Sequence, residues 1–194
     1  MKAYLDITLL PSDDIGHHFL WGKVYQQLHL ALVENKNADG LSSFGVTFPE
    51  FNAEKHQLGR KLRVFGPDQD SLGELDLTQW MQRLQDYVHI TSIRETPKQV
   101  SGYMRFSRLR TKSNKERLAR RAAKRKGTSL QQALEDRKSF QPQRTNAPFI
   151  QLKSMGNNHP FQLFIGYETL ASQTNNKSGF SSYGLSKGQS LPMF

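Results

Sequence analysis

The stretch "AYLDITLL" at residues 3–10 mixes apolar and β-branched residues over the length of a strand and stops at Pro11. This composition predicts a strand. The segment "HFLWGKVYQQLHLALVE" (18–34) follows it and repeats apolar residues at helical spacing, with Leu20, Val24, Leu28, Ala31 and Leu32 on one side. That spacing predicts an amphipathic helix. The pair begins an alternation of strand and helix that decides the fold class.

The alternation continues over the first half of the chain. Short apolar segments at 44–49 and 61–66 predict strands, "LTQWMQRLQDYV" (77–88) predicts a helix, and "VHITSIR" (88–94) predicts a further strand. The order β–α–β–β–α–β is that of the ferredoxin-like arrangement, a sheet with two helices on one face. We therefore predict an α+β protein whose N-terminal ferredoxin-like (RRM-like) domain spans residues 1–96. This fold hosts many unrelated functions.

The pattern changes after residue 96. Residues 100–110 predict a strand that leads into a basic connection, and 115–126 and 129–138 predict helices. The segments at 149–154, 161–168 and 180–187 predict strands separated by turns rich in Asn, Gly and Ser. We predict a second domain over residues 97–194 that combines strands with an Arg-rich helix.

The positive charge is concentrated in one segment. The 194 residues carry a formal net charge of +10. Between Arg105 and Lys126 there are eleven Lys or Arg residues and one acid, Glu116, while the other residues carry 16 basic and 16 acidic side chains. Focusing of this kind speeds the encounter with anions and is typical of nucleic-acid-binding surfaces. It favours a polyanion site over a merely solvated helix face.

The basic helix has two sides. At 100° per residue, one arc of about 140° collects Arg117, Arg120, Arg121, Lys124 and Arg125. The opposite side holds Leu118, Ala119, Ala122 and Ala123. The run from Ser113 to Glu116 predicts a capping box, and Gly127 predicts a left-handed C-terminal cap. Such a helix suits phosphates, but the charge alone does not choose between DNA and RNA.

Composition excludes several classes of protein. There is no cysteine, so disulfides and thiolate metal sites are ruled out. No stretch approaches the roughly 20 apolar residues of a membrane span, and "MKAYLDITLL" lacks the features of a signal peptide. We expect a cytoplasmic protein with no membrane partner, no cofactor and no bound metal.

Several motifs together resemble one known family. "SRLRTKSNKERLARR" (107–121), "FIQLKS" (149–154), "FQLFI" (161–165) and "FSSYGLSKG…PMF" (180–194) are similar to the subtype I-F CRISPR RNA-processing endoribonucleases. The likeness covers nearly the full chain. It implies a protein that binds the stem-loop in each repeat of a CRISPR precursor transcript and cuts at the 3′ base of that stem. It also implies that the protein stays on the guide RNA, together with other type I-F subunits, in a surveillance complex.

The resemblance also implies a mechanism and its residues. In the family the 2′-hydroxyl attacks the neighbouring phosphate without a metal and leaves a 2′,3′-cyclic phosphate. His29 matches the catalytic His, Ser154 matches a Ser that positions the 2′-hydroxyl, and Tyr183 matches a Tyr that orients the His. By pattern alone these are an ordinary helix residue, a turn hydroxyl and a packed aromatic. His159, near Ser154, is the rival proton acceptor, since histidine titrates near neutral pH.

The remaining histidines carry no catalytic motif. His17 and His18 lie at a predicted helix start, where a structural role is favoured, and no motif surrounds His56 or His89.

The family's RNA-binding residues also have counterparts. Phe161 matches an aromatic that lies against the last base pair of the stem, and Arg108 and Arg110 match linker residues that read base edges. The phosphate-gripping set on and before the helix is Lys112, Arg117, Arg120, Arg121, Lys124 and Arg125.

Three positions depart from the family pattern. Arg110 stands where the pattern has an amide residue, Gly156 replaces a second Ser, and residues 128–146 match only loosely. Two alternatives stay open at this point: a non-catalytic stem-loop-binding protein on the same scaffold, and a basic ribosome-associated protein.

Overall fold

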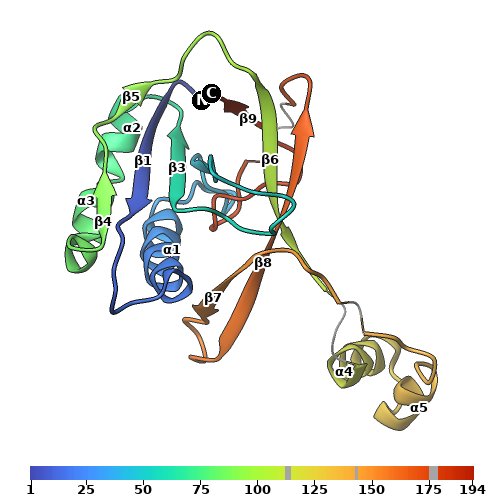
Figure 1. Cartoon of the computed structure of the whole chain (residues 1–194). Helices are drawn as coiled ribbons and strands as arrows, with labels where there is room; N and C mark the ends of the chain where they lie inside the picture. The colour runs from blue at the N-terminus through green and yellow to red at the C-terminus, as the bar shows by residue number, and fades with distance from the viewer. Residues whose placement is uncertain (112–114, 143, 175–178) are drawn as a thin grey trace. The chain divides into compact units, whose positions relative to one another are not determined.

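A computed structural model describes residues 1–111, 115–142, 144–174 and 179–194. The chain divides into two compact units, the first made of Met1–Arg108 with Ala147–Phe194 and the second of Leu109–Asn146. The described part of the first unit contains two β-sheets packed with helices, whereas the second unit is helical (Figure 1). The predicted α+β class is confirmed. The predicted boundary at residue 96 stays a prediction.

The first sheet is built around the N-terminal strand. Its strands in the described part of the chain are β1 (Ala3–Leu9), β2 (Gly45–Thr47), β3 (Lys61–Gly66), β4 (Val88–Ile90) and β5 (Arg94–Glu95). Their order is β2-β3-β1-β4, and β5 also pairs with β1. Every one of these pairs is antiparallel. The strands predicted at 3–10, 44–49 and 61–66 therefore form, with shifts of one or two residues at their ends.

Both faces of β1 are covered, which explains why the strand reads as almost continuously apolar. Leu5, Ile7 and Leu9 belong to the main core beside α1 (His17–Glu34), whereas Tyr4 packs with Phe65 in a second cluster. Alternate side chains of a strand point to opposite faces, so one strand serves both clusters.

A buried ion pair joins β1 to β3. Asp6 faces Arg63 across the sheet, and the Arg63 Nε lies 2.7 Å from the Asp6 carboxylate. The guanidinium also lies over the rings of Tyr4 and Phe194, 4.6 and 4.1 Å from their centroids. In Figure 1 the two ends of the chain lie together, in agreement with the 4.9 Å between the Tyr4 and Phe194 rings.

Helix α1 forms where the apolar spacing predicts it. All five residues of the predicted stripe are buried, and so are Trp21 and Tyr25. A helix with such a broad buried face gains most of its stability from packing rather than from intrinsic propensity.

The region 69–95 differs from the prediction in three ways. An unpredicted helix, α2 (Gln69–Glu74), is capped at its N-terminus by Asp68, whose carboxylate accepts a hydrogen bond from the Ser71 amide. The helix predicted at 77–88 is only α3 (Leu77–Trp80) followed by a 3-10 turn at Gln82–Leu84. The strand predicted at 88–94 is split into β4 and β5, because the Thr91 hydroxyl, rather than a backbone carbonyl, accepts from the Asp6 amide.

The second sheet has the order β7-β8-β6-β9 in the described part of the chain. Its strands are β6 (Gly102–Leu109), β7 (Phe149–Lys153), β8 (Pro160–Leu170) and β9 (Leu191–Met193). The prediction was right for 100–110, 149–154 and 161–168, and it missed β9. It was wrong for 180–187: beyond the isolated bridge between Ser42 and Phe180, this segment forms turns.

The second unit contains α4 (Lys115–Lys126) and α5 (Leu130–Glu135). On the side of α4 where small residues were predicted, Ala119 and Ala122 are buried, as is Ala133 of α5. Gly127 ends α4 in the predicted left-handed conformation at φ 68°, and the Thr128 amide donates to the Ala123 carbonyl.

The predicted capping box includes residues 113 and 114, which lie outside the described residues. Glu116 contacts Arg120 at 3.0 Å on the exposed side of α4. No helix in the described part of the chain is both long enough and apolar enough to cross a membrane.

Candidate active site

Helix α1 lies close to the second sheet along one face. Gly22, Gln26 and His29 follow one another at spacings of four and three residues, so they share a side of the helix. At Gly22 the approach is tight, since a Cβ atom there would lie 2.7 Å from the Gln151 carbonyl oxygen of β7. The absence of a side chain at Gly22 lets the helix bring His29 toward the C-terminal part of the first unit.

His29 meets the turn that carries Tyr183. The two rings are stacked, with centroids 4.2 Å apart and planes 8° from parallel. The Nδ1 of His29 lies 2.6 Å from the Ser182 carbonyl oxygen. A carbonyl only accepts hydrogen bonds, so Nδ1 carries the hydrogen and donates it. In the neutral ring Nε2 then holds the lone pair, which is the form that can take up a proton.

The surroundings favour this neutral form. Partial burial lowers the pKa of His29 below its ordinary value, and the charges of Lys36 and Arg108 lower the pKa further. The hydrogen bond to the Ser182 carbonyl acts in the opposite direction, but the balance is a lowered pKa. The lowered pKa therefore favours the neutral form of His29, whose Nε2 can accept a proton.

The turn at 181–184 is fixed by its own hydrogen bonds and by β2. The Gly184 amide donates to the Ser181 carbonyl at 2.8 Å, and the Val46 amide donates to the Gly184 carbonyl at 2.9 Å. Gly184 has φ 67°, and a Cβ atom there would lie 2.6 Å from Val46 Cγ1. Only glycine fits both the backbone and the space. This requirement explains why glycine follows Tyr183 in a segment that was predicted to be a strand and is a turn.

Tyr25 supports the same turn from α1. Its hydroxyl donates to the Tyr183 carbonyl at 2.8 Å, and its side chain is fully buried. Burial, and secondly the neighbouring Tyr183 phenol, raise the pKa of Tyr25, so it stays a neutral donor. The sequence gives no sign of this role, because an aromatic residue inside an apolar helical stripe has the pattern of an ordinary core residue.

Ser186, in the segment 180–194 that resembles the family, also has a structural role. Its hydroxyl accepts from the amides of Gly188 and Gln189 at 3.1 and 3.0 Å. This buried Ser therefore organises the turn that follows Tyr183.

Ser154 begins the turn between β7 and β8. It is half-buried, its amide donates to the His159 carbonyl at 2.9 Å, and its carbonyl accepts from the Asn158 amide at 2.8 Å. Gln26 of α1 contacts the residues on either side of it, Lys153 and Met155. The structure thus ties the Ser154 turn to the helix face that carries His29. The rival His159 is exposed in the same turn.

Arg108 lies close to the aromatic rings of two predicted site residues, Phe161 and Tyr183. Its guanidinium carbon is 5.4 Å from the centroid of the Phe161 ring and 5.5 Å from that of Tyr183. These distances are within the range of cation–π attraction. Phe161 is half-buried and packs against the main core. His29, Tyr183, Arg108 and Phe161 therefore form one continuous cluster in the first unit.

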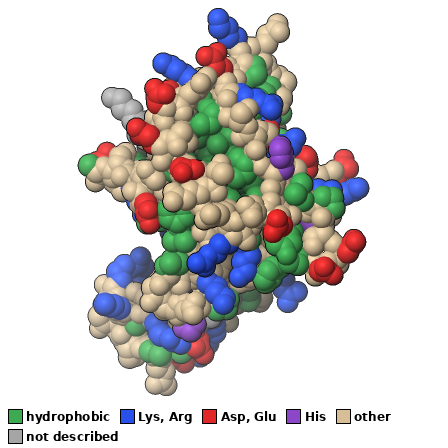
Figure 2. Space-filling view, turned by 90° about the vertical axis from the view of Figure 1, so that its left-hand side faces the viewer, with side chains coloured by type: hydrophobic (Ala, Val, Ile, Leu, Met, Phe, Trp, Pro, Cys, Tyr) green, Lys and Arg blue, Asp and Glu red, His purple; other side chains and the backbone are tan. Residues whose placement is uncertain are grey.

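The other predicted binding residues belong to the second unit. Arg110 is exposed, and so is the predicted front of α4: Arg117, Arg120, Arg121, Lys124 and Arg125. Lys112 lies outside the described residues. Residues 109–146 include twelve Lys or Arg and three acids, a net charge of +9 out of the total of +10. By contrast, acidic and basic side chains are intermixed over the face of the first unit that Figure 2 shows.

The remaining histidines have separate surroundings. His17 starts α1 as predicted and accepts from Arg60 Nε at 3.2 Å, while His18 stacks on Phe149. His56 and His89 are exposed. Among the described residues, no three His, Cys, Asp or Glu side chains are grouped closely enough to hold a metal ion.

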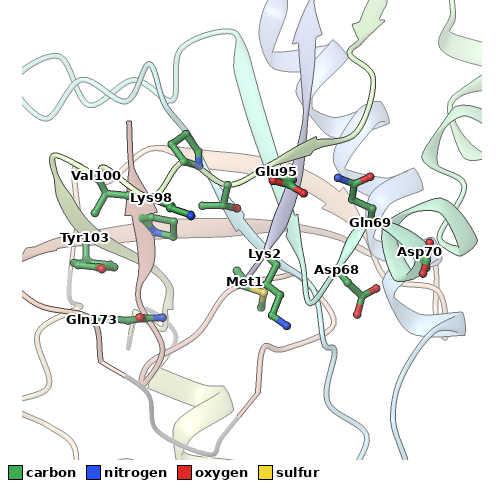
Figure 3. Close-up of a pocket in the computed structure, with 13 residues that line it drawn as sticks. Met1, Lys2, Asp68, Gln69, Asp70, Glu95, Lys98, Val100, Tyr103 and Gln173 are labelled. Atoms are coloured by element: carbon green, nitrogen blue, oxygen red, sulfur yellow. The ribbon is translucent and has the colours of Figure 1, made fainter.

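A hollow of about 690 Å³ lies elsewhere in the first unit, beside the start of β1. Figure 3 shows Lys2 near Asp68, with Glu95, Lys98 and Tyr103 also on its walls. None of the described residues that line it is a predicted site residue. The described structure brings His29 and Tyr183 into contact and links the Ser154 turn to α1 through Gln26, and none of these residues lines this hollow.

Comparison with known proteins identifies the chain. The family model described as "CRISPR-associated protein (Cas_Csy4)" matches residues 4–194. This match puts the α+β chain among the CRISPR-associated proteins. Within that class, it belongs to the Csy4 family, which confirms the resemblance seen in the sequence.

Two curated relatives align over their whole length. The chain is 34% identical to the CRISPR-associated endonuclease Cas6/Csy4 of Escherichia coli strain UTI89, and 33% identical to the protein of the same name from Pseudomonas aeruginosa strain UCBPP-PA14. Each alignment spans 194 residues and covers 100% of both chains.

Proposed function

We propose that this protein is an endoribonuclease that cuts CRISPR precursor RNA at the 3′ base of each repeat stem-loop. The observation that carries the proposal is the geometry of His29, whose Nδ1 donates to the Ser182 carbonyl and whose Nε2 is left as a proton acceptor. Membership of the Csy4 family, with relatives named as endonucleases, supports it.

The reaction needs no metal in this proposal. His29 Nε2 takes the proton of the 2′-hydroxyl beside the scissile phosphate, and the 2′-oxygen attacks the phosphorus. The bond from phosphorus to the 5′-oxygen breaks, and the departing 5′-oxygen takes a proton from water, so the products are a 2′,3′-cyclic phosphate and a 5′-hydroxyl. The protonated imidazole then returns its proton to water. Ser154 orients the 2′-hydroxyl, and Tyr183 holds the imidazole by stacking. General base catalysis by a positioned side chain contributes typically about 10²–10⁴-fold to a rate.

RNA binding is assigned to both units. Phe161 stacks on the last base pair of the stem, with a contribution of roughly 1–3 kcal/mol by analogy with single-strand binders. Arg108 and Arg110 read base edges, since arginine forms bidentate contacts with guanine. Lys112 and the exposed front of α4 grip phosphates, and an A-form stem accepts such a helix best near its end or loop.

The proposal extends to the fold and the cellular setting. The strand order β2-β3-β1-β4 with antiparallel pairs supports a ferredoxin-like arrangement for the first sheet. After cleavage the protein stays on the guide-RNA hairpin, with the other subunits of a type I-F surveillance complex, in the cytoplasm.

The test is cleavage of the repeat hairpin RNA in EDTA followed by analysis of the new ends. We expect a cyclic phosphate and a 5′-hydroxyl. A hairpin with a 2′-deoxy nucleotide upstream of the scissile phosphate should bind equally well and stay intact. Uncut wild-type hairpin that is nevertheless bound would favour the non-catalytic RNA-binding alternative. Equal competition by an unrelated stem-loop would favour the ribosome-associated alternative.

A further inference from the structure

Gln26 holds both neighbours of Ser154. Its Oε1 accepts from the Lys153 amide at 3.3 Å, and its Nε2 donates to the Met155 sulfur at 3.4 Å. One side-chain amide therefore brackets the residue between them. The hydrogen bonds inside the turn, such as that from the Asn158 amide to the Ser154 carbonyl, shape the turn but do not reach α1.

Gln26 also lies one helical turn before His29. Residues three apart are neighbours on a helix surface, so the group that binds the Ser154 turn and the imidazole project from the same face of α1. Residues 155–160 are exposed and Met155 is 66% exposed. The bonds to Gln26 thus restrain an otherwise solvent-exposed turn at the point where its Ser must be placed.

We propose that Gln26 is a positioning residue that sets the Ser154 hydroxyl in register with His29 Nε2. The inference rests on the proposed function, in which Ser154 orients the 2′-hydroxyl. Gln26 does not touch the reacting atoms. A misplacement of about 1 Å in a reacting geometry can lower a rate by about 100-fold, so two bonds that fix this register matter for cleavage and little for RNA affinity.

The experiment measures single-turnover cleavage of saturating repeat hairpin, together with hairpin affinity. Gln26→Ala should lower the rate about 10- to 100-fold and leave the dissociation constant within about twofold, which also shows that the variant is folded. Gln26→Met keeps the length of the side chain but not its amide, and should be as slow as the alanine variant. The matched control is Gln27→Ala. Gln27 is the adjacent residue and lines a separate hollow with Trp80 and Arg83, so this variant should cleave the hairpin at the wild-type rate.

A double-mutant cycle decides whether Gln26 acts through Ser154. Ser154→Ala should be slow, and adding Gln26→Ala to it should cause no further loss, because the hydroxyl to be positioned is already gone. If the rate losses of Ser154→Ala and Gln26→Ala multiply in the double variant, the inference is wrong. It is also wrong if Gln26→Ala or Gln26→Met cleaves at the wild-type rate. A wild-type protein that leaves the hairpin intact would instead overturn the proposed function itself.

Discussion

The two compact units differ in the size of the side chains that each buries and in the net charge that each carries. The first unit buries large side chains such as Tyr25, Phe48 and Phe65, and its 15 basic and 14 acidic residues nearly balance. The second unit buries Ala119, Ala122 and Ala133 and carries a net charge of +9. A fully buried large apolar side chain contributes roughly 1.5–3 kcal/mol, and an alanine methyl much less.

The difference indicates a division of labour. The first unit has a core of large buried side chains, which can hold the residues of the proposed cleavage site in place. The second has little core and repelling charges on α4, so a polyanion that neutralises them stabilises it. We expect changes in the first unit to alter the cleavage rate and changes in the second to alter RNA affinity.

The largest effect should come from His29→Ala. Removing the proposed proton acceptor should lower single-turnover cleavage by about 10²–10⁴-fold, while hairpin affinity changes by less than about twofold, because the proposed phosphate contacts are on α4. The control is His159→Ala, which removes the rival histidine and should cut normally. If His29→Ala cuts the hairpin at the wild-type rate, another group is the base, and the expectation that changes in the first unit alter the cleavage rate is contradicted.

Gly184→Ala should destabilise the first unit. The left-handed backbone and the close contact with Val46 together should cost about 2–4 kcal/mol in free energy of unfolding. Trp21 and Trp80 both belong to the first unit, so tryptophan fluorescence in denaturant measures it.

The matched control for this change lies in the second unit. Gly127 has nearly the same φ, but nothing lies within 4 Å of its Cβ position. Gly127→Ala should leave the tryptophan transition unchanged. If both variants shifted it equally, the crowding at Val46 would not be the cause.

Replacing Arg121 and Arg125 together with alanine should weaken binding and leave saturated cleavage unchanged. Each lost phosphate contact removes about one unit from the slope of log affinity against log salt, so the slope should fall by about two. The same loss of charge on the first unit, Lys55→Ala with Arg83→Ala, should not change the slope. An unaltered slope in the α4 variant would remove this helix from the interface.

The smallest effect concerns pH. The base must be neutral, so cleavage should fall as pH drops through the pKa of His29, and that midpoint should lie below the ordinary histidine value because burial and nearby cations lower the pKa. Lys36→Gln removes one of those cations and should move the midpoint upward. Single-turnover rates measured at subsaturating protein concentrations from pH 5 to 8 report both midpoints for the free protein. A downward shift in the variant would contradict the electrostatic assignment.

Local patterns in the sequence predicted much of the fold. The α1 stripe, β1, β3 and the two-sided α4 with its left-handed cap at Gly127 were all readable, because periodicity and glycine placement act over a few residues. The helix at 77–88 was overestimated because the apolar spacing there continues through a 3-10 turn. The segment 180–187 was misread because its aromatic and apolar residues pack as turns against β2, and this packing depends on distant Val46.

The site was predictable only in part. Resemblance named His29, Ser154, Tyr183, Arg108 and Phe161, and the structure gathers them around α1. The carbonyl of Ser182, the hydroxyl of Tyr25 and the amide of Gln26 left no local signal. The contacts of a backbone carbonyl do not depend on the residue type that the sequence records. A Tyr or Gln in a helical pattern is interpreted as an ordinary core or surface residue. Their roles come from segments that meet only in the folded chain.

The contact between His29 and Ser182 spans 153 residues of chain. A ribosome that adds 5–20 residues per second completes the partner turn about 8–30 s after it has made His29. Until then a nascent chain carries the histidine without the carbonyl and the tyrosine that orient it. Under the proposed function, the protein is therefore unable to cut RNA until the Ser182 turn has been made and has folded against His29.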